Sequence, residues 1–201
     1  EIRTIEPDAL MFVENVPRLE MPVWSAEDAP NIVHASHWYD IATLFLRLFF
    51  PFLNMNIWTG KLVFGRKQVH RLFVEQLANI KHASKERMGD VPTLIGEFGT
   101  SFNMPGKLNY RLNWFMMQEW ALDATFRALE ANLLNGTLWN YTSDNSNKRG
   151  DLWNTEDLSI FSRDQQRSQD GPDAGGRALR AVVRPYPVST AGAPLHMEFN
   201  M

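Results

Sequence analysis

The chain has 201 residues, of which 44% are hydrophobic and 12% aromatic. This is enough for one sizeable core and part of a second domain. Its 20 basic and 23 acidic residues are interspersed and give a net charge of −3, with no basic stripe that would indicate a nucleic-acid partner. The absence of cysteine excludes disulfides and thiolate chemistry.

Two apolar runs in the first 40 residues have the length of β-strands. Residues 9–16 follow a break at Pro7, and residues 31–40 follow a loop that contains several prolines. The next segment, residues 41–58, is the most apolar of the chain. Because Arg47, Pro51 and two asparagines interrupt it, we do not expect it to span a membrane.

The middle of the chain predicts two long helices around one strand. Residues 66–88 carry apolar side chains close to a 3.6-residue period, and Gly89-Asp90 ends that helix. A strand ending at Glu97 follows. Residues 107–134 predict the second helix, whose inner side we expect to be formed by Leu112, Phe115, Met116, Trp120, Leu122, Phe126 and Leu129.

The last third predicts one further strand of the same kind and then a change of character. Residues 136–142 form that strand, and residues 143–170 form a long polar loop with a short helix around 156–160. Residues 177–183, 185–187 and 196–201 read as short strands. The loop has six side chains that could suggest calcium binding, but they lack the spacing and the terminal Glu of an EF-hand: Asp144, Asn145, Asn147, Asp151, Asn154 and Asp157.

The alternation of strands and helices predicts right-handed βαβ units and a parallel sheet, so the fold class is α/β. No glycine-rich phosphate loop follows the first strand, which argues against an open doubly wound sheet. Four strands that end in polar or aromatic groups fit half of a (β/α)8 barrel better. We therefore predict a half-barrel over residues 1–170 and the start of a β-sandwich over residues 171–201.

A single carboxylate stands out in the stretch Gly96-Glu97-Phe98-Gly99. Glycines on both sides of Glu97 allow a ligand or another backbone to come close. One interpretation is a catalytic carboxylate at the carboxyl end of a barrel strand. The other is a strand-ending Glu that faces water, and this stretch alone does not decide between them.

The order of motifs resembles glycoside hydrolase family 5. A strand ending in His37-Trp38-Tyr39, a strand ending in the Glu97 motif and a strand ending in Trp139 occur in that family's order on the sixth, seventh and eighth barrel strands. The stretch 138–160 (LWNYTSDNSNKRGDLWNTEDLSI) is similar to the endoglycoceramidase-related branch, which includes fungal glucosylceramidases and sterylglucosidases. The stretch 184–192 (RPYPVSTAG) is similar to that branch's entry into its β-sandwich.

The resemblance implies a role for each matching residue. Glu97 corresponds to the nucleophile, His37 and Tyr39 to residues that hold the sugar and the carboxylates, and Trp139 to a tryptophan that stacks on the sugar. A retaining glycosidase needs a second carboxylate as acid/base. In this family it follows an Asn on the fourth strand, upstream of this chain. Glu14 has the reverse order, in Phe-Val-Glu-Asn, and is not expected to serve.

The resemblance therefore implies a retaining β-glycosidase that acts on a glycolipid and requires no cofactor or metal. The expected partners are the substrate, the missing N-terminal half of the barrel and, through residues 41–58, the surface of a membrane. That segment could equally line a groove for the lipid part of the substrate or pack under a loop. Two alternatives remain open: a soluble β-glucanase, and a non-catalytic half-barrel that binds carbohydrate or serves as a structural subunit.

Overall fold

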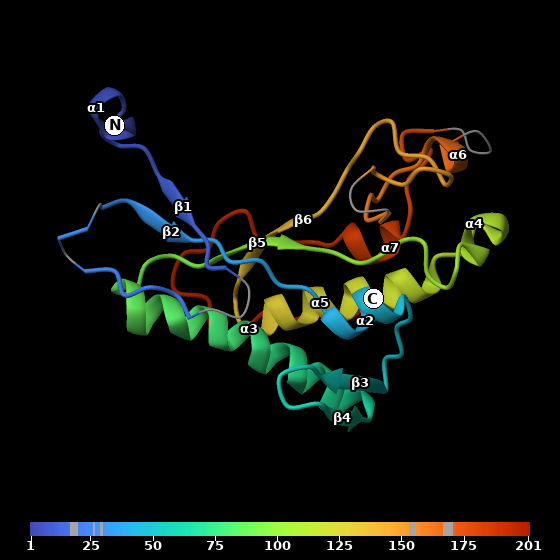
Figure 1. The fold of residues 1–201 in the computed structure, drawn as a ribbon, viewed down its shortest axis with the longest axis horizontal. Helices are drawn as coiled ribbons and strands as arrows, with labels where there is room; N and C mark the ends of the chain where they lie inside the picture. The colour runs from blue at the N-terminus through green and yellow to red at the C-terminus, as the bar shows by residue number, and fades with distance from the viewer. Residues whose placement is uncertain (17–19, 26, 29, 153–155, 167–170) are drawn as a thin grey trace.

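The fold was analysed in a computed structural model that describes residues 1–16, 20–25, 27–28, 30–152, 156–166 and 171–201. Short parallel strands form its centre, and two long helices lie side by side on one face of them (Figure 1). No helix in these ranges is long and apolar enough to cross a membrane. The mixed α/β content agrees with the predicted fold class.

Four parallel strands bring the predicted site together. They are β1 (Met11–Val13), β2 (Ile32–His34), β5 (Leu94–Phe98) and β6 (Asn135–Leu138). β1 pairs with β2, and β5 pairs with β6. The two pairs are joined by a parallel bridge between His34 and Thr93 and by the Trp38 N–H, which donates to the Glu97 carbonyl oxygen at 2.9 Å. The four predicted strands are therefore confirmed, with bounds that differ from the predicted ones.

The helix predicted over residues 66–88 is confirmed as α3 (Arg66–Met88). Its buried face includes Val69, Phe73 and Leu77, which pack in the main core with Ile95 of β5. The helix ends where Gly89 adopts the left-handed conformation, at a φ of 72°. Glycine has no Cβ and takes this conformation at little cost.

The single helix predicted over residues 107–134 is wrong. The chain forms α4 (Leu108–Leu112) and α5 (Met116–Ala131), separated where Asn113 takes a left-handed conformation at a φ of 48°. Asparagine tolerates that conformation better than most residues and so can end a helix. The break leaves Leu112 exposed rather than on the inner side, whereas Leu122 and Leu129 are buried as expected.

Between β2 and α3 the chain folds back on itself. A short helix, α2 (Ile41–Leu46), is followed by an antiparallel hairpin of β3 (Leu53–Asn56) and β4 (Lys61–Phe64). The hairpin was not predicted, because the run of apolar residues from 41 to 58 hides the alternation of its strands. A four-residue helix, α1 (Ile2–Ile5), precedes β1 at the start of the chain.

The predicted short helix at residues 156–160 is also wrong. Residues 156–160 contain no helix, and Leu158 and Ile160 instead bond through their backbones to Asn140. The short helix of this region is α6 (Arg163–Gln166). Asn154, one of the loop residues considered above, lies outside the described residues.

The strand predicted over residues 177–183 is a helix, α7 (Leu179–Val182). Ala178 and Ala181 are buried against α5 beside Phe115 and Leu122, and their spacing of three residues suits a helix better than a strand. The strands predicted at 185–187 and 196–201 are wrong as well.

Arg184 and Phe199, in the last 18 residues, are hydrogen-bonded to side chains of α5. Arg184 Nη1 donates to Asp123 at 2.7 Å, and Arg184 Nε donates to Glu130 at 2.9 Å. The same Glu130 carboxylate accepts from the Phe199 N–H at 3.0 Å. Glu130 thus gives the backbone N–H of Phe199 an acceptor that a neighbouring strand would otherwise provide.

A buried ion pair fastens the loop after β6. Both Nη atoms of Arg177 donate to the Asp157 carboxylate, at 2.9 and 2.6 Å, and the guanidinium lies 4.4 Å from the centre of the Phe102 ring. Tyr110 Oη and Asn145 Nδ2 also donate to Asp157. The Asp157 carboxylate is therefore the common partner of α4, of the loop after β6 and of Arg177, just before α7.

We expect Arg177→Met to lower the free energy of unfolding of the chain by about 3–5 kcal/mol, because it leaves the Asp157 carboxylate buried without its cation. Arg180→Met is the matched control, since Arg180 is 73% exposed and meets Glu119 only at 3.8 Å. Denaturant unfolding measures both variants. Equal stability of the two would contradict the structural importance of the Asp157–Arg177 pair.

Candidate active site

The site is formed around Glu97 by residues from three neighbouring strands. Glu97 lies near the carboxyl end of β5, while His37 and Tyr39 follow β2 and Glu14 follows β1. Because the carboxyl ends of parallel strands meet at one edge, residues far apart in sequence become neighbours there. Of the four predicted site residues, three belong to this group: Glu97, His37 and Tyr39.

Two side chains contact the same oxygen of Glu97. Tyr39 Oη donates to Oε2 at 3.1 Å, and His37 Nδ1 lies 3.3 Å from Oε2. The other oxygen, Oε1, has no hydrogen-bond partner among the residues that the structure describes. The Glu97 side chain is 27% exposed. The carboxylate is thus held through one oxygen, while its other oxygen has no hydrogen bond to the described residues.

Glu14 forms a contact that the sequence did not reveal. Its Oε2 lies 2.7 Å from His37 Nε2, so the imidazole ring lies between Glu14 and Glu97. The two carboxylates therefore do not face each other directly, as the pair of a retaining glycosidase would at about 5–5.5 Å. The arrangement agrees with the expectation that Glu14 is not the acid/base, and it shows Glu14 as the residue that orients His37.

A buried hydrogen-bond chain holds the segment next to Glu14. Ser36 Oγ donates to Asn15 Oδ1 at 2.6 Å and lies 2.5 Å from His34 Nε2, while His34 Nδ1 lies 2.6 Å from Ser84 Oγ on α3. Burial lowers the pKa of His34, so the ring stays neutral within this chain. We infer that this network fixes the backbone that carries Glu14.

Glycines on both sides of Glu97 let the neighbouring strands approach. A Cβ at Gly96 would overlap the Ala35 carbonyl oxygen, and a Cβ at Gly99 would overlap the Trp139 carbonyl oxygen. Trp139 N–H donates to the Phe98 carbonyl oxygen at 2.8 Å, and the peptide bond between Trp139 and Asn140 is cis. The structure therefore places Trp139 beside Gly99; the stacking role of its indole stays a prediction.

Acidic residues from the loop after β6 add to the negative charge near Tyr39. Burial, the Glu97 charge and, more weakly, the charges of Glu156 and Asp151 raise the pKa of Tyr39 well above the usual value. The pKa of Glu156 is itself raised, by burial and by Asp151. Sequence reasoning missed Glu156 as a neighbour of the site, because no local pattern distinguishes it from a solvated loop carboxylate.

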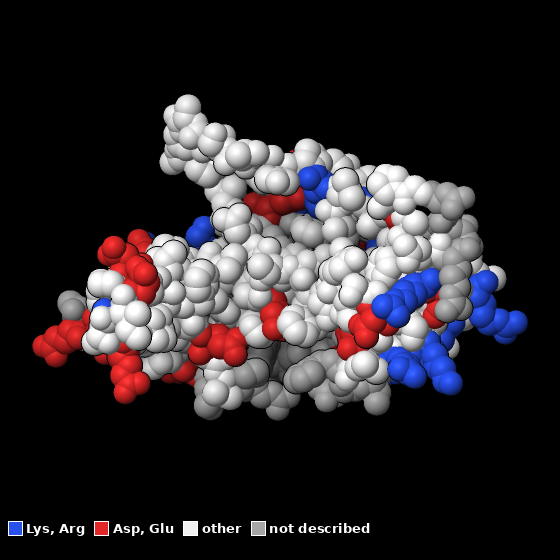
Figure 2. Space-filling view, turned by 90° about the horizontal axis from the view of Figure 1, so that it is seen from above, with Lys and Arg blue, Asp and Glu red and all other residues white. Residues whose placement is uncertain are grey.

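Trp38 is buried and packs against Phe73, with 5.0 Å between the ring centres. Charged side chains are unevenly distributed on the surface. Seen from above, Lys and Arg gather at the end that holds α4 and α6, and Asp and Glu lie toward the other end (Figure 2). The strands direct their carboxyl ends toward the basic end (Figure 1).

Among the described residues, no group of His, Asp and Glu could hold a metal ion.

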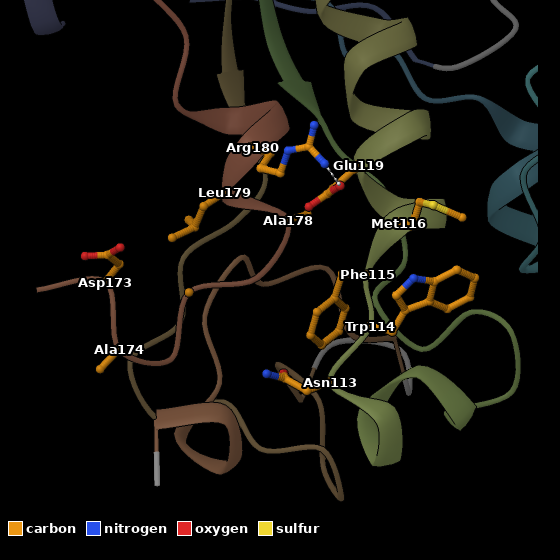
Figure 3. Close-up of a pocket in the computed structure, with 11 residues that line it drawn as sticks. Asn113, Trp114, Phe115, Met116, Glu119, Asp173, Ala174, Ala178, Leu179 and Arg180 are labelled. Carbon is orange, nitrogen blue, oxygen red and sulfur yellow. Dashed lines mark ion pairs between the residues drawn. The ribbon is translucent and has the colours of Figure 1, made fainter. Parts of the chain in front are cut away.

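A cavity of about 620 Å³ lies apart from these residues, between the start of α5 and residues 173–180. Trp114, Phe115 and Leu179 are among the residues that line it (Figure 3). Glu119 and Arg180 form an ion pair at its edge. None of the four predicted site residues lines this cavity, so its volume does not support the site around Glu97.

Known proteins that are similar to this chain are glycolipid hydrolases by name. The chain is 33% identical to a glucosylceramidase of Cryptococcus neoformans over 94% of this chain and 28% of that protein. It is 33% identical to an ergosteryl-beta-glucosidase of Saccharomyces cerevisiae over 66% of this chain and 19% of that protein. The crystal structure of Cryptococcus neoformans sterylglucosidase 1 matches with a TM-score of 0.91 and 27% identity over 99% of this chain and 32% of that one.

No protein-family model matches the chain. The similarities in sequence and structure nevertheless define its class as that of the glycoside hydrolases. Within that class, the chain belongs to the fungal glucosylceramidase and sterylglucosidase branch, which confirms the resemblance inferred from the sequence motifs. It spans about a third or less of the length of these relatives.

We expect Gly96→Ala to destabilise the chain by about 1–3 kcal/mol, since the added methyl group must push the Ala35 carbonyl away from β5. Gly192→Ala is the control, because nothing lies within 4 Å of the added carbon. Denaturant unfolding measures the difference. A Gly96→Ala variant as stable as Gly192→Ala would show that the strands do not approach as closely as described.

The raised pKa of Tyr39 gives a test with a defined sign. An ordinary tyrosine ionises at about pH 10. Because the folded state keeps the proton on Tyr39, the stabilisation that this residue gives the fold is fully present below about pH 10 and is lost as the pH rises further.

We therefore expect Tyr39→Phe to leave the phenolate absorbance of the folded chain unchanged up to about pH 11 and to reduce it only after unfolding. Spectrophotometric titration of folded and denatured protein measures this. A smaller phenolate signal in the folded variant would mean that Tyr39 is accessible and ionises normally.

Proposed function

We propose that this chain supplies the nucleophile side of a retaining β-glycosidase that acts on a glycolipid of the glucosylceramide or sterylglucoside type. The observation that carries the proposal is the partly exposed Glu97 carboxylate, held at Oε2 by Tyr39 and His37 and without a hydrogen bond from the described residues at Oε1. The names of the relatives support a glycolipid substrate. They give no support to a soluble β-glucanase or to a non-catalytic half-barrel.

In the proposed reaction, Glu97 Oε1 attacks the anomeric carbon of the sugar. The bond to the leaving oxygen breaks as the acid/base carboxylic acid gives that oxygen a proton, and a covalent glycosyl–enzyme intermediate forms. Water, activated by the same acid/base, then attacks the anomeric carbon and releases Glu97. A nucleophile must be ionised, and hydrogen-bond donors such as Tyr39 stabilise an ionised carboxylate.

The acid/base carboxylate is proposed to come from outside these 201 residues. Glu14 is separated from Glu97 by the ring of His37, so it is poorly placed to protonate a leaving oxygen on the far side of the sugar. We assign Glu14 to the orientation of His37 and assign Trp139 to the face of the sugar. His37 and Tyr39 complete the group that holds the substrate and the nucleophile.

The proposed architecture is the second half of a (β/α)8 barrel over residues 1–170, with the start of a β-sandwich over residues 171–201. Two features support the half-barrel: the parallel order β1–β2–β5–β6, and the position of α3 and α5 on one face of the strands (Figure 1). A barrel carries its helices on the outside only. The missing strands would be those of an N-terminal half, which we propose as the partner of this chain.

The decisive test is covalent labelling with a 2-fluoro-glucoside inactivator, followed by intact mass and peptide mapping. It should be run on the full chain alone and together with an N-terminal half of the barrel. We expect an adduct on Glu97 when the site is complete and none in Glu97→Gln. Glu75→Gln, which changes an exposed carboxylate on α3, should label like the unchanged chain.

We also expect Glu97→Gln to lower the hydrolysis of glucosylceramide or a sterylglucoside by the assembled enzyme more than about a thousandfold, because loss of a covalent nucleophile has cost about 10⁶ in kcat in another hydrolase. Release of the free lipid measures the rate. If folded, assembled protein forms no adduct and Glu97→Gln retains full activity, Glu97 is not the nucleophile.

A further inference from the structure

A cluster of exposed apolar side chains covers α2 and the β3–β4 hairpin. Six large side chains between residues 45 and 64 are each more than half exposed: Phe45, Leu46, Phe52, Trp58, Leu62 and Phe64. Soluble proteins rarely expose so many large apolar groups in one short segment, and such patches mark interaction sites. We refer to this cluster as the 45–64 surface.

The two faces of the hairpin differ. Asn54 and Val63 pair across the strands and turn toward the protein, where Asn54 Nδ2 donates to Asp40 at 2.8 Å and Val63 packs against the main core. Side chains alternate along a strand, so Leu62 and Phe64 lie on the opposite face. Their partners across the strands are Met55 and Leu53, which makes that outer face entirely apolar.

The charged residues within this part of the sequence are all of one sign, although Asp40 lies just before it and Glu75, which pairs with Arg71, just after it. From residue 41 to residue 74 the chain contains five basic residues and no Asp or Glu: Arg47, Lys61, Arg66, Lys67 and Arg71. Acidic residues outnumber basic ones over the whole chain, by 23 to 20. An apolar surface whose own segment carries five basic and no acidic residues fits the anionic face of a lipid bilayer, where apolar side chains enter the interface and cations meet the headgroups.

We propose that the 45–64 surface docks on the anionic surface of a lipid bilayer. The position of the surface gives the docking a purpose, because α2 begins two residues after Tyr39, which contacts Glu97. A bilayer docked there would lie at the edge of the candidate site. The inference deepens the proposed function, since a glycolipid substrate resides in a bilayer, but docking itself requires neither catalysis nor a glycolipid.

Flotation of the full chain with vesicles free of glycolipid tests the proposal. We expect binding to phosphatidylcholine vesicles that contain about 30% phosphatidylserine, weaker binding to pure phosphatidylcholine, and a loss of binding as salt is raised. Leu62→Ser/Phe64→Ser should weaken binding more than about tenfold. Val188→Ser/Leu195→Ser is the matched control, because these residues are 91% and 92% exposed outside the surface.

Two further measurements distinguish docking through this surface from non-specific adsorption to lipid. Lys61→Glu should reduce binding to anionic vesicles, whereas Lys85→Glu, at the far end of α3, should not. Lipids brominated on their acyl chains should quench tryptophan fluorescence, and Trp58→Phe should remove most of that quenching. Equal quenching in Trp58→Phe would show that another part of the chain meets the lipid and would overturn the proposal.

Other outcomes are equally decisive. One such outcome is a chain that forms a dimer without lipid, that becomes monomeric in Leu62→Ser/Phe64→Ser, and that does not float with vesicles in either form. The 45–64 surface would then join two copies of the chain, and the proposal would be wrong. Glu97→Gln separates this inference from the proposed function. If the assembled protein floats with vesicles but Glu97 is not labelled, the docking proposal stands and the proposed glycosidase function is contradicted. If Glu97 is labelled but the protein does not float, the proposed function stands and the docking proposal is contradicted.

Discussion

The close approach of three backbones around Glu97 is the constraint on which the site depends. At Gly96 the Ala35 carbonyl occupies the space of a side chain, and at Gly99 the Trp139 carbonyl does the same. These contacts set the spacing between β5 and the segments that follow β2 and β6. Because Tyr39 and His37 reach the same oxygen of Glu97, a shift of either neighbouring segment would separate the carboxylate from its partners.

Further hydrogen bonds and ion pairs hold in place the residues that contact Glu97. Glu14 holds the far side of His37, and the chain from Ser84 through His34 and Ser36 to Asn15 connects that region to α3. Buried polar networks of this kind are effective only when every member has a partner. On the other side of Glu97, the Asp157–Arg177 pair fastens the loop whose acidic residues add weakly to the effect of burial and of Glu97 in raising the pKa of Tyr39.

The distribution of surface groups complements this arrangement. The parallel strands direct their carboxyl ends toward the end where basic side chains gather, and the 45–64 surface begins just after Tyr39 (Figures 1 and 2). Chemistry on a substrate held in a bilayer requires the catalytic carboxylate to lie near the surface that meets the lipid. The proposed nucleophile and the proposed docking surface satisfy this requirement through one short connection.

The sequence by itself determined the features that depend on local pattern. The period of apolar residues and the glycine after Met88 define α3, and the ends of two strands point to Glu97, His37 and Tyr39 as the predicted site residues. Only the tertiary structure decided the break at Asn113, the helix at 179–182, the hairpin and the contact between Glu14 and His37. The reason is that periodicity and turn residues act over a few neighbours, whereas these features depend on partners that the fold brings from elsewhere in the chain.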